Sequence, residues 1–465
     1  MSAPFLWIIL PLGMGGFLLL IRNERVLTVI GGALTLLLSL LAFIVPINTA
    51  LLIGPFSLKL EGSLFVLGRS FVLTPSDGPL LAILYGLAAM WFLGAESLGM
   101  ARRLIPLGLS ILALLVASTA VQPFLFAAVL IEIAVLLAIP MLLPPNQTPG
   151  RGIVRFVIYQ TLSIPFILFA GWLLAGIETS PGDIALTTQS TAMLVMGFAF
   201  LLAIFPMYTW IPMLMEEAPP YLVGFILWIL PQTTALFAMS FLDRYTFLRT
   251  SPDLMNALRA AGLLMVVSAG IWSAFQRHLG RLMGYAAIAE TGFLLIALSL
   301  GTASGVQIIF LQIIPRGLGL VIWAMALSTL QSQADPPRFA NVQGAARAMP
   351  FAVAGLVLAD LSAAGFPLLA GFPVRLSLLE SLARQSSGMT IWLALGLLGL
   401  ITGAVRTLAV TVMTPAEIPW EMRETRTQAI LIAVGILALI GLGIFPQASR
   451  FLMDKLPALF EHLGT

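Results

Sequence analysis

The sequence has 465 residues, of which 60% are hydrophobic and 9% are charged, and its formal net charge is +3. Soluble globular domains are about 25% charged, so this composition cannot cover a water-facing surface and indicates an integral membrane protein. The sequence has no cysteine, which excludes disulfides, cysteine-ligated zinc and iron–sulfur clusters, and it has no basic run that favours nucleic-acid binding. Any redox chemistry must therefore belong to partner proteins.

Apolar segments of the length that crosses a bilayer, about 20 residues, follow one another along the whole chain. About 14 are expected, which predicts an all-α membrane bundle. Their centres lie near residues 12, 36, 88, 111, 133, 164, 199, 230, 263, 292, 318, 357, 400 and 437.

Two regions outside these segments have patterns of their own. Between the second and third segments, apolar and polar residues alternate on both sides of the turn sequence Glu61-Gly62-Ser63. This pattern predicts a β-hairpin outside the membrane, and an irregular loop is the alternative. The tail ASRFLMDKLPALFEHLGT after the last segment predicts an amphipathic helix at the membrane surface.

The loops differ in basic residues, which sets the expected orientation. Odd-numbered loops, which include the pairs Arg22 and Arg25, and Arg102 and Arg103, hold more arginine and lysine than even-numbered loops. The positive-inside rule then places the odd-numbered loops in the cytoplasm and both termini on the outer side of the membrane.

Charged side chains within the apolar segments are rare and therefore informative. A charge at mid-bilayer costs about 2.5 to 3.5 kcal/mol on insertion scales, so it requires a partner, a water-filled cavity or a neutral form. A row of such groups through a bundle is typical of a proton or ion path, and structural ion pairing is the alternative. The candidates are Glu132, Glu290, Arg316, Asp360 and Arg375.

Proline and glycine interrupt two of the segments. In AIFPMYTWIPMLMEEAPP, Pro206 lacks a backbone donor, and the carbonyl that it frees must be satisfied by protein or water because lipid offers no partner. The second interruption, AAGFPLLAGFPVRL, contains Gly365, Pro367, Gly371 and Pro373. Interrupted spans in both halves of a chain indicate an inverted-repeat transporter whose site lies at the breaks.

At these breaks the chain resembles the antiporter-like membrane subunits of respiratory complex I, a family shared with Mrp-type cation/proton antiporters and membrane-bound hydrogenases. FPMYTWIPMLMEEAPP is similar to the family pattern P-L-H-x-W-L-P-D-A-H-x-x-A-P, and AAGFPLLAGFPVR to S-L-A-G-L-P-P-L-A-G-F-x-x-K. HLGRLMGYAAIAETGF resembles D-L-K-R-L-L-A-Y-S-S-I-x-H-M-G-F, and LQIIPRGLG resembles Q-M-x-A-H-G-L. The matches keep the family's order from about residue 77 to residue 380.

The resemblance implies 14 transmembrane helices that include two inverted five-helix repeats, broken helices 7 and 12, and a β-hairpin between helices 2 and 3. The expected parts are residues 1–100 (helices 1–3 and the hairpin), 101–245 (first repeat, helices 4–8), 250–412 (second repeat, helices 9–13) and 425–465 (helix 14 and the amphipathic tail).

The family's proton-carrying residues are only partly kept. The resemblance places Leu201 at the lysine of helix 7 and Gln232 at the lysine of helix 8. The glutamate of helix 5 is kept as Glu132, and the cation of helix 12 is kept as Arg375. Two positions that carry histidine in the family carry Glu290 and Arg316 here. Leucine and glutamine cannot carry a proton, and arginine does not release one near neutral pH.

These departures lead to three expectations. Glu132 should be a neutral or water-bridged carboxyl group that faces the interior of the bundle. Glu290 and Arg316 should compensate each other's charge. The first half of the proton path should be interrupted between Glu132 and Gln232, whereas the second half keeps its charges.

The resemblance implies a membrane-arm subunit of a complex I-type assembly that takes part in, or structurally supports, proton translocation coupled to quinone reduction. An Mrp-type antiporter or hydrogenase subunit and a non-translocating structural subunit are the alternatives. The chain is expected to hold no cofactor, metal or catalytic residue; quinone, NADH or ferredoxin, flavin and iron–sulfur clusters are expected on partner subunits. The other expected partners are membrane subunits, lipid, and protons or cations, in a bacterial inner membrane.

Overall fold

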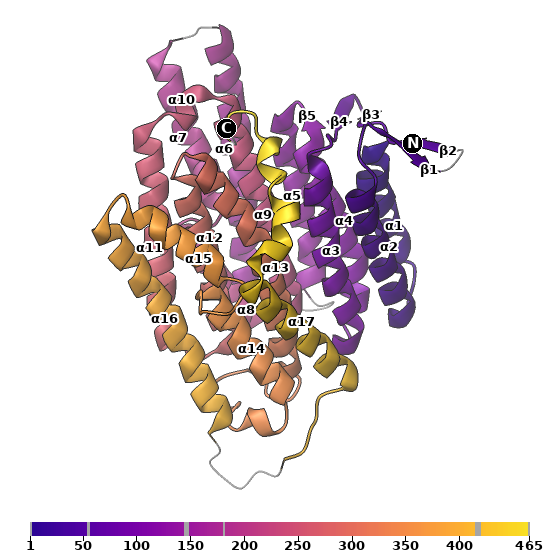
Figure 1. Ribbon diagram of the computed structural model, residues 1–465, viewed down its shortest axis with the longest axis vertical. Helices are drawn as coiled ribbons and strands as arrows, with labels where there is room; N and C mark the ends of the chain where they lie inside the picture. Colours follow the sequence, from indigo (N-terminus) through magenta and orange to yellow (C-terminus); the bar gives the residue numbers. More distant parts are fainter. Residues whose placement is uncertain (1, 54–55, 144–147, 180–181, 414–419, 464–465) are drawn as a thin grey trace.

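The computed structural model describes residues 2–53, 56–143, 148–179, 182–413 and 420–463 as a bundle of long helices (Figure 1). In these residues, 12 helices are long and apolar enough to cross a membrane. Two shorter apolar helices, Phe5–Leu18 and Pro350–Ala363, bring the number of apolar helices to 14. Each of them covers one of the segment centres expected from the sequence, so the predicted all-α membrane fold is confirmed.

Short polar residues fix where many of the helices begin. Asn23, Asp183, Ser251, Thr302 and Ser386 each accept a backbone N–H from the first turn of a helix, the usual N-cap arrangement.

In chain order the α-helices are α1 (Leu10–Leu18), α2 (Glu24–Ile44), α3 (Asp77–Ala95), α4 (Ala101–Ala120), α5 (Ala127–Leu142), α6 (Arg151–Thr179), α7 (Ile184–Leu201), α8 (Trp210–Glu217), α9 (Pro220–Arg244), α10 (Thr246–Arg249), α11 (Pro252–Phe275), α12 (Leu279–Leu298), α13 (Ala303–Gln331), α14 (Pro350–Ala363), α15 (Phe372–Ala383), α16 (Ser387–Val412), α17 (Arg426–Ile444) and α18 (Arg450–Met453).

The segment between α2 and α3 forms two hairpins. Antiparallel pairs join β1 (Ala50–Ile53) to β2 (Phe56–Lys59), and β3 (Ser63–Val66) to β4 (Arg69–Val72), and β5 (Val121–Gln122) extends the second pair. The predicted β-hairpin between the second and third apolar segments is therefore confirmed.

The expected position of the hairpin turn is wrong. The turn between β3 and β4 is Leu67-Gly68, where both residues have positive φ, as a tight two-residue hairpin requires. Gly62 instead donates its N–H to Asn48 Oδ1 at 2.6 Å and accepts the N–H of Leu73 at 2.7 Å. The Glu61-Gly62-Ser63 segment is therefore held by neighbouring chain rather than forming a turn.

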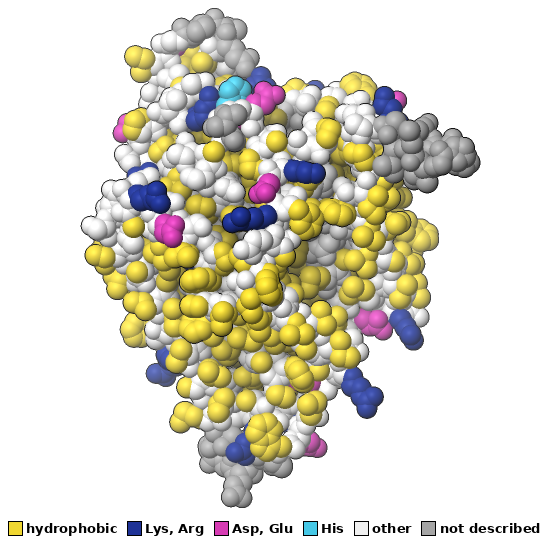
Figure 2. All heavy atoms as spheres, viewed as in Figure 1, with side chains coloured by type: hydrophobic (Ala, Val, Ile, Leu, Met, Phe, Trp, Pro, Cys, Tyr) yellow, Lys and Arg dark blue, Asp and Glu magenta, His cyan; other side chains and the backbone are white. Residues whose placement is uncertain are grey.

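Three central helices are surrounded by others. α9, α12 and α13 are almost wholly buried, whereas α6, α7, α11 and α16 bury only about a third of their residues. Figure 1 shows α9 and α13 in the middle of the bundle, with α11 and α16 on one side and α1 and α2 on the other. On the face shown in Figure 2, hydrophobic side chains cover a broad middle band, and charged side chains lie above and below it. Glu290 on α12 and Arg316 on α13 are thus enclosed by protein rather than by lipid.

Both predicted breaks are present. The first lies between the end of α7 at Leu201 and the start of α8 at Trp210, and it contains Pro206. The second lies between α14 and α15 and contains Gly365, Pro367 and Gly371, with Pro373 at the start of α15. The end of the molecule that carries the strands, called the hairpin end below, also holds both termini of the described chain (Figure 1).

At the opposite end, a histidine begins α12. His278 Nδ1 accepts the backbone N–H of Gly280 at 3.1 Å and of Arg281 at 3.4 Å. Burial is the main cause that lowers the pKa of His278 below its usual value. Charged groups around the ring act in both directions: Glu216 and Asp335 raise its pKa, and Arg281 and Arg338 lower it.

Acid should weaken this cap. Because the pKa of His278 is lower in the folded protein than in the unfolded chain, its stabilising effect is present above about pH 6.5 and is lost as the pH falls through the folded pKa. When the pH is lowered from 7.5 to about 5.5, the unfolding midpoint of the purified protein should decrease. The loss of stability should be about 1 kcal/mol, the typical contribution of one helix cap. His278→Asn keeps an acceptor without titrating, so its profile should be flatter; equal profiles would show that His278 does not set the pH dependence.

Candidate functional site

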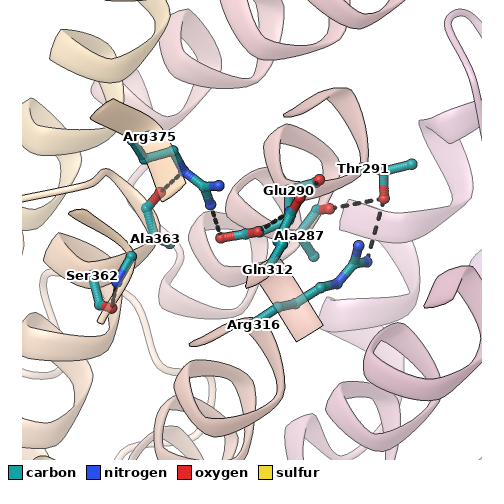
Figure 3. Close-up of polar contacts among 9 residues, drawn as sticks. Ala287, Glu290, Thr291, Gln312, Arg316, Ser362, Ala363 and Arg375 are labelled. Carbon is teal, nitrogen blue, oxygen red and sulfur yellow. Dashed lines mark hydrogen bonds and ion pairs between the residues drawn. The ribbon is translucent and has the colours of Figure 1, made fainter. Parts of the chain in front are cut away.

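Buried polar side chains from α12, α13 and α15 meet near the second break (Figure 3). Arg375 Nη2 donates to Glu290 Oε1 in an ion pair whose side chains are 4% and 6% exposed. Gln312 Nε2 donates to the other carboxylate oxygen of Glu290 at 2.5 Å and to its backbone carbonyl at 2.8 Å. Both oxygens of the Glu290 carboxylate are therefore engaged.

The second break places Arg375 at this position. Its Nε donates to the carbonyl of Ala363, at the end of α14, at 3.1 Å, and its guanidinium lies 3.8 Å from the centre of the Phe293 ring. Gly365 has a φ of +77°, and its missing side chain leaves room for the Arg375 stem. The second break thus places the guanidinium of Arg375 against the carboxylate of Glu290 on α12. The same guanidinium binds the carbonyl of Ala363 at the break.

Arg316 on α13 binds a backbone carbonyl that a proline leaves without its helical donor on another helix, α9. Pro231 in α9 has no N–H, so the carbonyl of Leu227, four residues earlier, lacks its helical donor. Arg316 Nη2 donates to this carbonyl at 3.1 Å and to Thr291 Oγ1 at 3.3 Å. Its Nε and Nη1 are buried and have no hydrogen-bond partner among the described residues.

Two small cavities meet at Arg316. The one that we call the α14 cavity, with a volume of about 20 Å³, is lined by residues of the second break such as Ser362 and Gly371, and by Glu290. The one that we call the α7 cavity, about 10 Å³, is lined by residues of the first break, 201 to 203, and by Trp210. Arg316 and Ala287 line both. The guanidinium of Arg316 therefore lies between the two helix breaks.

The other predicted residues lie apart from this cluster. Asp360 on α14 is wholly buried, and neither oxygen of its carboxyl group has a partner in the described chain. Gln232 on α9 is 1% exposed, its Nε2 has no partner there either, and it lines neither cavity. Glu132 on α5 is only half-buried, and its Oε1 accepts the hydroxyl of the exposed Thr161 at 2.7 Å. The Oε2 of Glu132 is buried and has no hydrogen-bond partner in the described chain, so the expectation that this carboxyl group faces the interior of the bundle stays a prediction.

The expected pairing of Glu290 with Arg316 is wrong. The ion partner of Glu290 is Arg375, because the second break brings the start of α15 against α12, whereas Arg316 turns toward the Leu227 carbonyl. The sequence interpretation also missed Gln312, the neutral donor to Glu290. Its spacing was a usable signal, since residues four apart, such as Gln312 and Arg316, share one helix face.

The chemistry open to these groups is limited by their contacts. Glu290 is bound by two donors, and the arginines do not release protons near neutral pH. Among the buried carboxyl groups of the described residues, Asp360 and Glu132 have an oxygen without a hydrogen-bond partner, and a carboxyl group in that state can take up and release a proton. In the part of the chain that the structure describes, no group of three or more His, Asp or Glu side chains could hold a metal ion.

Comparisons with solved structures give the fold. A chain of the Mrp complex from a Dietzia species has a TM-score of 0.81 at 14% identity, covering 100% of this chain and 99% of that one. A chain of the membrane-bound sulfane sulfur reductase, an archaeal respiratory membrane complex, has a TM-score of 0.79 at 18% identity, covering 100% and 98%. A chain of respiratory complex I from Thermus thermophilus has a TM-score of 0.77 at 19% identity, covering 99% and 100%.

Comparisons of sequence give the family. NADH-quinone oxidoreductase subunit 14 of Thermus thermophilus is 27% identical over 434 residues, which are 88% of this chain and 95% of that subunit. Subunit N of Rhodococcus opacus is 24% identical over 334 residues, which are 66% and 60% of the two chains. The family model described as "NADH:quinone oxidoreductase/Mrp antiporter, TM" matches residues 154–402, more than half of the chain and both helix breaks. The chain therefore belongs to the transmembrane family of NADH:quinone oxidoreductase and Mrp antiporter subunits.

Proposed function

We propose that this chain is the antiporter-like subunit in the membrane arm of a complex I-type assembly, where it supports proton translocation coupled to quinone reduction through a remodelled path. The observation that carries the proposal is the group of buried charges Glu290, Arg375 and Arg316, held between two broken helices in the middle of the bundle. Charged groups persist inside a membrane bundle where they serve an ion path or pair with one another. The match to 95% of a complex I subunit supports the type of assembly.

Within this path, Asp360 is the proposed proton carrier of the second half. It is buried, its carboxyl oxygens are unpaired, and it lies on the helix that ends at the second break. The first half is proposed to be interrupted, because Leu201 gives the α7 cavity an apolar wall and Gln232 lies outside that cavity. Glu290, Arg375 and Arg316 would supply fixed charges beside the path.

The assembly around the chain is part of the same proposal. Other membrane subunits would contact it, and NADH or ferredoxin, flavin, iron–sulfur clusters and quinone would bind to partner subunits. The hairpin end would face the outside of a bacterial inner membrane, in line with the distribution of basic residues in the loops. Residues 101–245 and 250–412 would form the two inverted repeats, each with one broken helix.

The stoichiometry of proton transfer tests these roles. In sealed vesicles that contain the purified complex, Asp360→Asn should clearly lower the number of protons moved per electron pair, because an amide cannot bind and release a proton. Gln232→Ala should leave this number almost unchanged and serves as the matched control, since Gln232 is another buried polar side chain with an unpaired atom.

Either deviation would count against the proposal. A clear drop for Gln232→Ala would show that the first half conducts protons. An unchanged stoichiometry for Asp360→Asn in a fully assembled complex would favour a non-translocating structural subunit, a role that the tight pairing of Glu290 with Arg375 also fits.

The second candidate is a subunit of an Mrp-type antiporter or a related membrane-bound complex. The TM-score of 0.81 with a chain of an Mrp complex favours it as much as the complex I match does. Purification of the chain with its bound subunits separates the two, because quinone-reducing and antiporter assemblies contain different partner proteins.

A further inference from the structure

An apolar groove runs along the surface of the bundle beside the C-terminal tail, residues 446–463, which is yellow in Figure 1 and packs on α3 and α13. The groove, which we call the tail groove, has a volume of about 340 Å³. Its lining includes Leu40 of α2, Leu87 of α3, Ile314 of α13, and Phe451 and Leu452 of the tail. Leu40 and Phe451 are each 55% exposed, so the groove is open to the surroundings of the protein.

The wall of the tail groove suits an apolar occupant. Among the described residues that line it, Ser39 carries the polar side chain, and its hydroxyl donates to the carbonyl of Ala82 at 2.7 Å. The other lining side chains are aliphatic or aromatic, and Gly86 adds none. Such a wall gains from contact with an apolar molecule and offers a polar one little to bind.

The tail groove has about the depth of one lipid leaflet. Its lining starts at Phe43, one residue before the end of α2, which leads into the strands at the hairpin end. It reaches Leu87, ten positions after Asp77 at the start of α3. At 1.5 Å per residue, these ten positions span about 15 Å. The hydrocarbon core is about 30 Å thick, so the groove extends from the hairpin end to about the middle of the membrane.

The width of the tail groove favours a lipid chain over a helix. A volume of about 340 Å³ spread over a length of about 15 Å leaves a mean cross-section of about 23 Å². An α-helix at least 10 Å in diameter needs about 80 Å². An acyl chain is a single file of methylene groups, about 4 to 5 Å wide given the contact distance between carbons, and therefore fits.

The tail forms the rim of the groove at the hairpin end. The ring of Phe451 packs edge-on against the ring of Phe43, with 5.7 Å between the ring centres. Because Phe43 lies at the end of α2, this contact holds the start of α18 near the level at which the membrane-spanning helices end. A residue next to Phe451 is thus placed where lipid headgroups begin.

Two cations lie on this rim. Arg450 directly precedes Phe451, and Lys455 follows shortly after it. Both side chains are exposed, and within the described residues neither takes part in an ion pair. Asp454 lies between them, so the segment from Arg450 to Lys455 carries a net charge of +1. A cation near a membrane surface attracts anionic lipid about fivefold.

We propose that the tail groove binds one acyl chain of an anionic phospholipid from the leaflet at the hairpin end, and that Arg450 and Lys455 hold its headgroup. The bound chain would cover Ile314, two residues before Arg316, and so seal the apolar side of α13 beside the buried charges. This site is independent of any part that the chain takes in proton translocation.

A lipid titration tests the proposal. The complex that contains the chain is purified in detergent, stripped of lipid and titrated with dioleoyl-phosphatidylglycerol or dioleoyl-phosphatidylcholine while the unfolding midpoint is measured. The two lipids have the same chains, but only the first has an anionic headgroup. The midpoint should rise saturably, at a lower concentration of phosphatidylglycerol. Phosphatidylglycerol with brominated chains should give bromine density in the tail groove in a map of the complex.

Headgroup variants test the two cations. Arg450→Gln combined with Lys455→Gln should raise the half-saturating phosphatidylglycerol concentration about 25-fold, about fivefold for each cation, and should bring it close to that of phosphatidylcholine. Arg22→Gln combined with Arg25→Gln is the matched control. It removes two exposed cations at the opposite end of α2, so the response should equal that of the wild type.

A groove variant tests the place of the chain. Leu40→Trp adds bulk inside the groove and should abolish both the saturable rise and the bromine density. Leu37→Trp is its control, because Leu37 lies on the same helix, is 54% exposed and does not line the groove. Both positions are exposed, so both variants should fold.

Three results would overturn the proposal. A map without bromine density in the tail groove, or with a helix of a partner subunit there, would exclude a bound lipid chain. Equal half-saturating concentrations of the two lipids would show that the tail does not select an anionic headgroup. Equal responses of Leu40→Trp and Leu37→Trp would place the lipid elsewhere.

Discussion

Replacing Arg375 by leucine should cost about 3 to 5 kcal/mol of stability, because it leaves the Glu290 carboxylate buried without its cation. Gln312 would remain as a neutral donor, and the carbonyl of Ala363 at the second break would lose its partner. We expect a lower yield of folded protein and a lower unfolding midpoint in detergent or nanodiscs.

Two further variants show whether the ion pair is the cause. Arg375→Leu combined with Glu290→Leu removes both charges and should recover much of the loss. Arg423→Leu is the control, because its pair with Glu421, at 3.3 Å, is more than half exposed and should be worth less than about 1 kcal/mol. A double variant no more stable than Arg375→Leu would mean that the two charges do not depend on each other.

Gly365→Ala should be strongly destabilising, because it acts on both the backbone of the second break and the position of Arg375. An alanine at a φ of +77° adds about 1 to 3 kcal/mol of backbone strain. Its Cβ would also lie 2.5 Å from Cγ and 2.7 Å from Cβ of Arg375, so the arginine would have to move away from Glu290. The loss should appear in the unfolding midpoint and should be smaller in a background that already carries the Arg375→Leu and Glu290→Leu changes.

The matched control is Gly441→Ala in α17, where nothing lies within 4 Å of the added carbon. Alanine favours helix over glycine by up to about 1 kcal/mol, so this variant should be neutral or slightly stabilised. Equal effects of the two substitutions would show that Gly365 has no special role in placing Arg375.

The helices and both breaks were predictable because the membrane leaves few choices. Lipid offers no hydrogen bonds, so apolar segments of sufficient length must be helical, and residues such as Pro206 and Gly365 must interrupt them. The hairpin turn was less predictable, because alternation continues through Gly62. Long-range contacts of Gly62 with Asn48 and Leu73 decide its conformation, and no local pattern records them.

The partner of Glu290 could not be predicted for a similar reason. Hydropathy shows that Glu290, Arg316 and Arg375 lie in the membrane, but the rotation of each helix about its axis decides which of them meet. Arg316 is drawn away by a carbonyl that Pro231 frees on a helix 89 residues earlier. The unpaired indole N–H groups of Trp210 and Trp323 were not predicted, because a tryptophan in an apolar segment is indistinguishable by sequence from an ordinary residue of the hydrophobic core.

The ion pair between Glu290 and Arg375 has a consequence for the biogenesis of the protein. The two residues are 85 positions apart. At a synthesis rate of 5 to 20 residues per second, about 4 to 17 s pass between the release of Glu290 from the ribosome and that of Arg375. If the chain enters the membrane while it is being made, the Glu290 side chain of α12 must wait beside the translocon until its cation arrives. The earlier helix α9, by contrast, is already in place when Arg316 arrives, so its Leu227 carbonyl can receive that guanidinium at once.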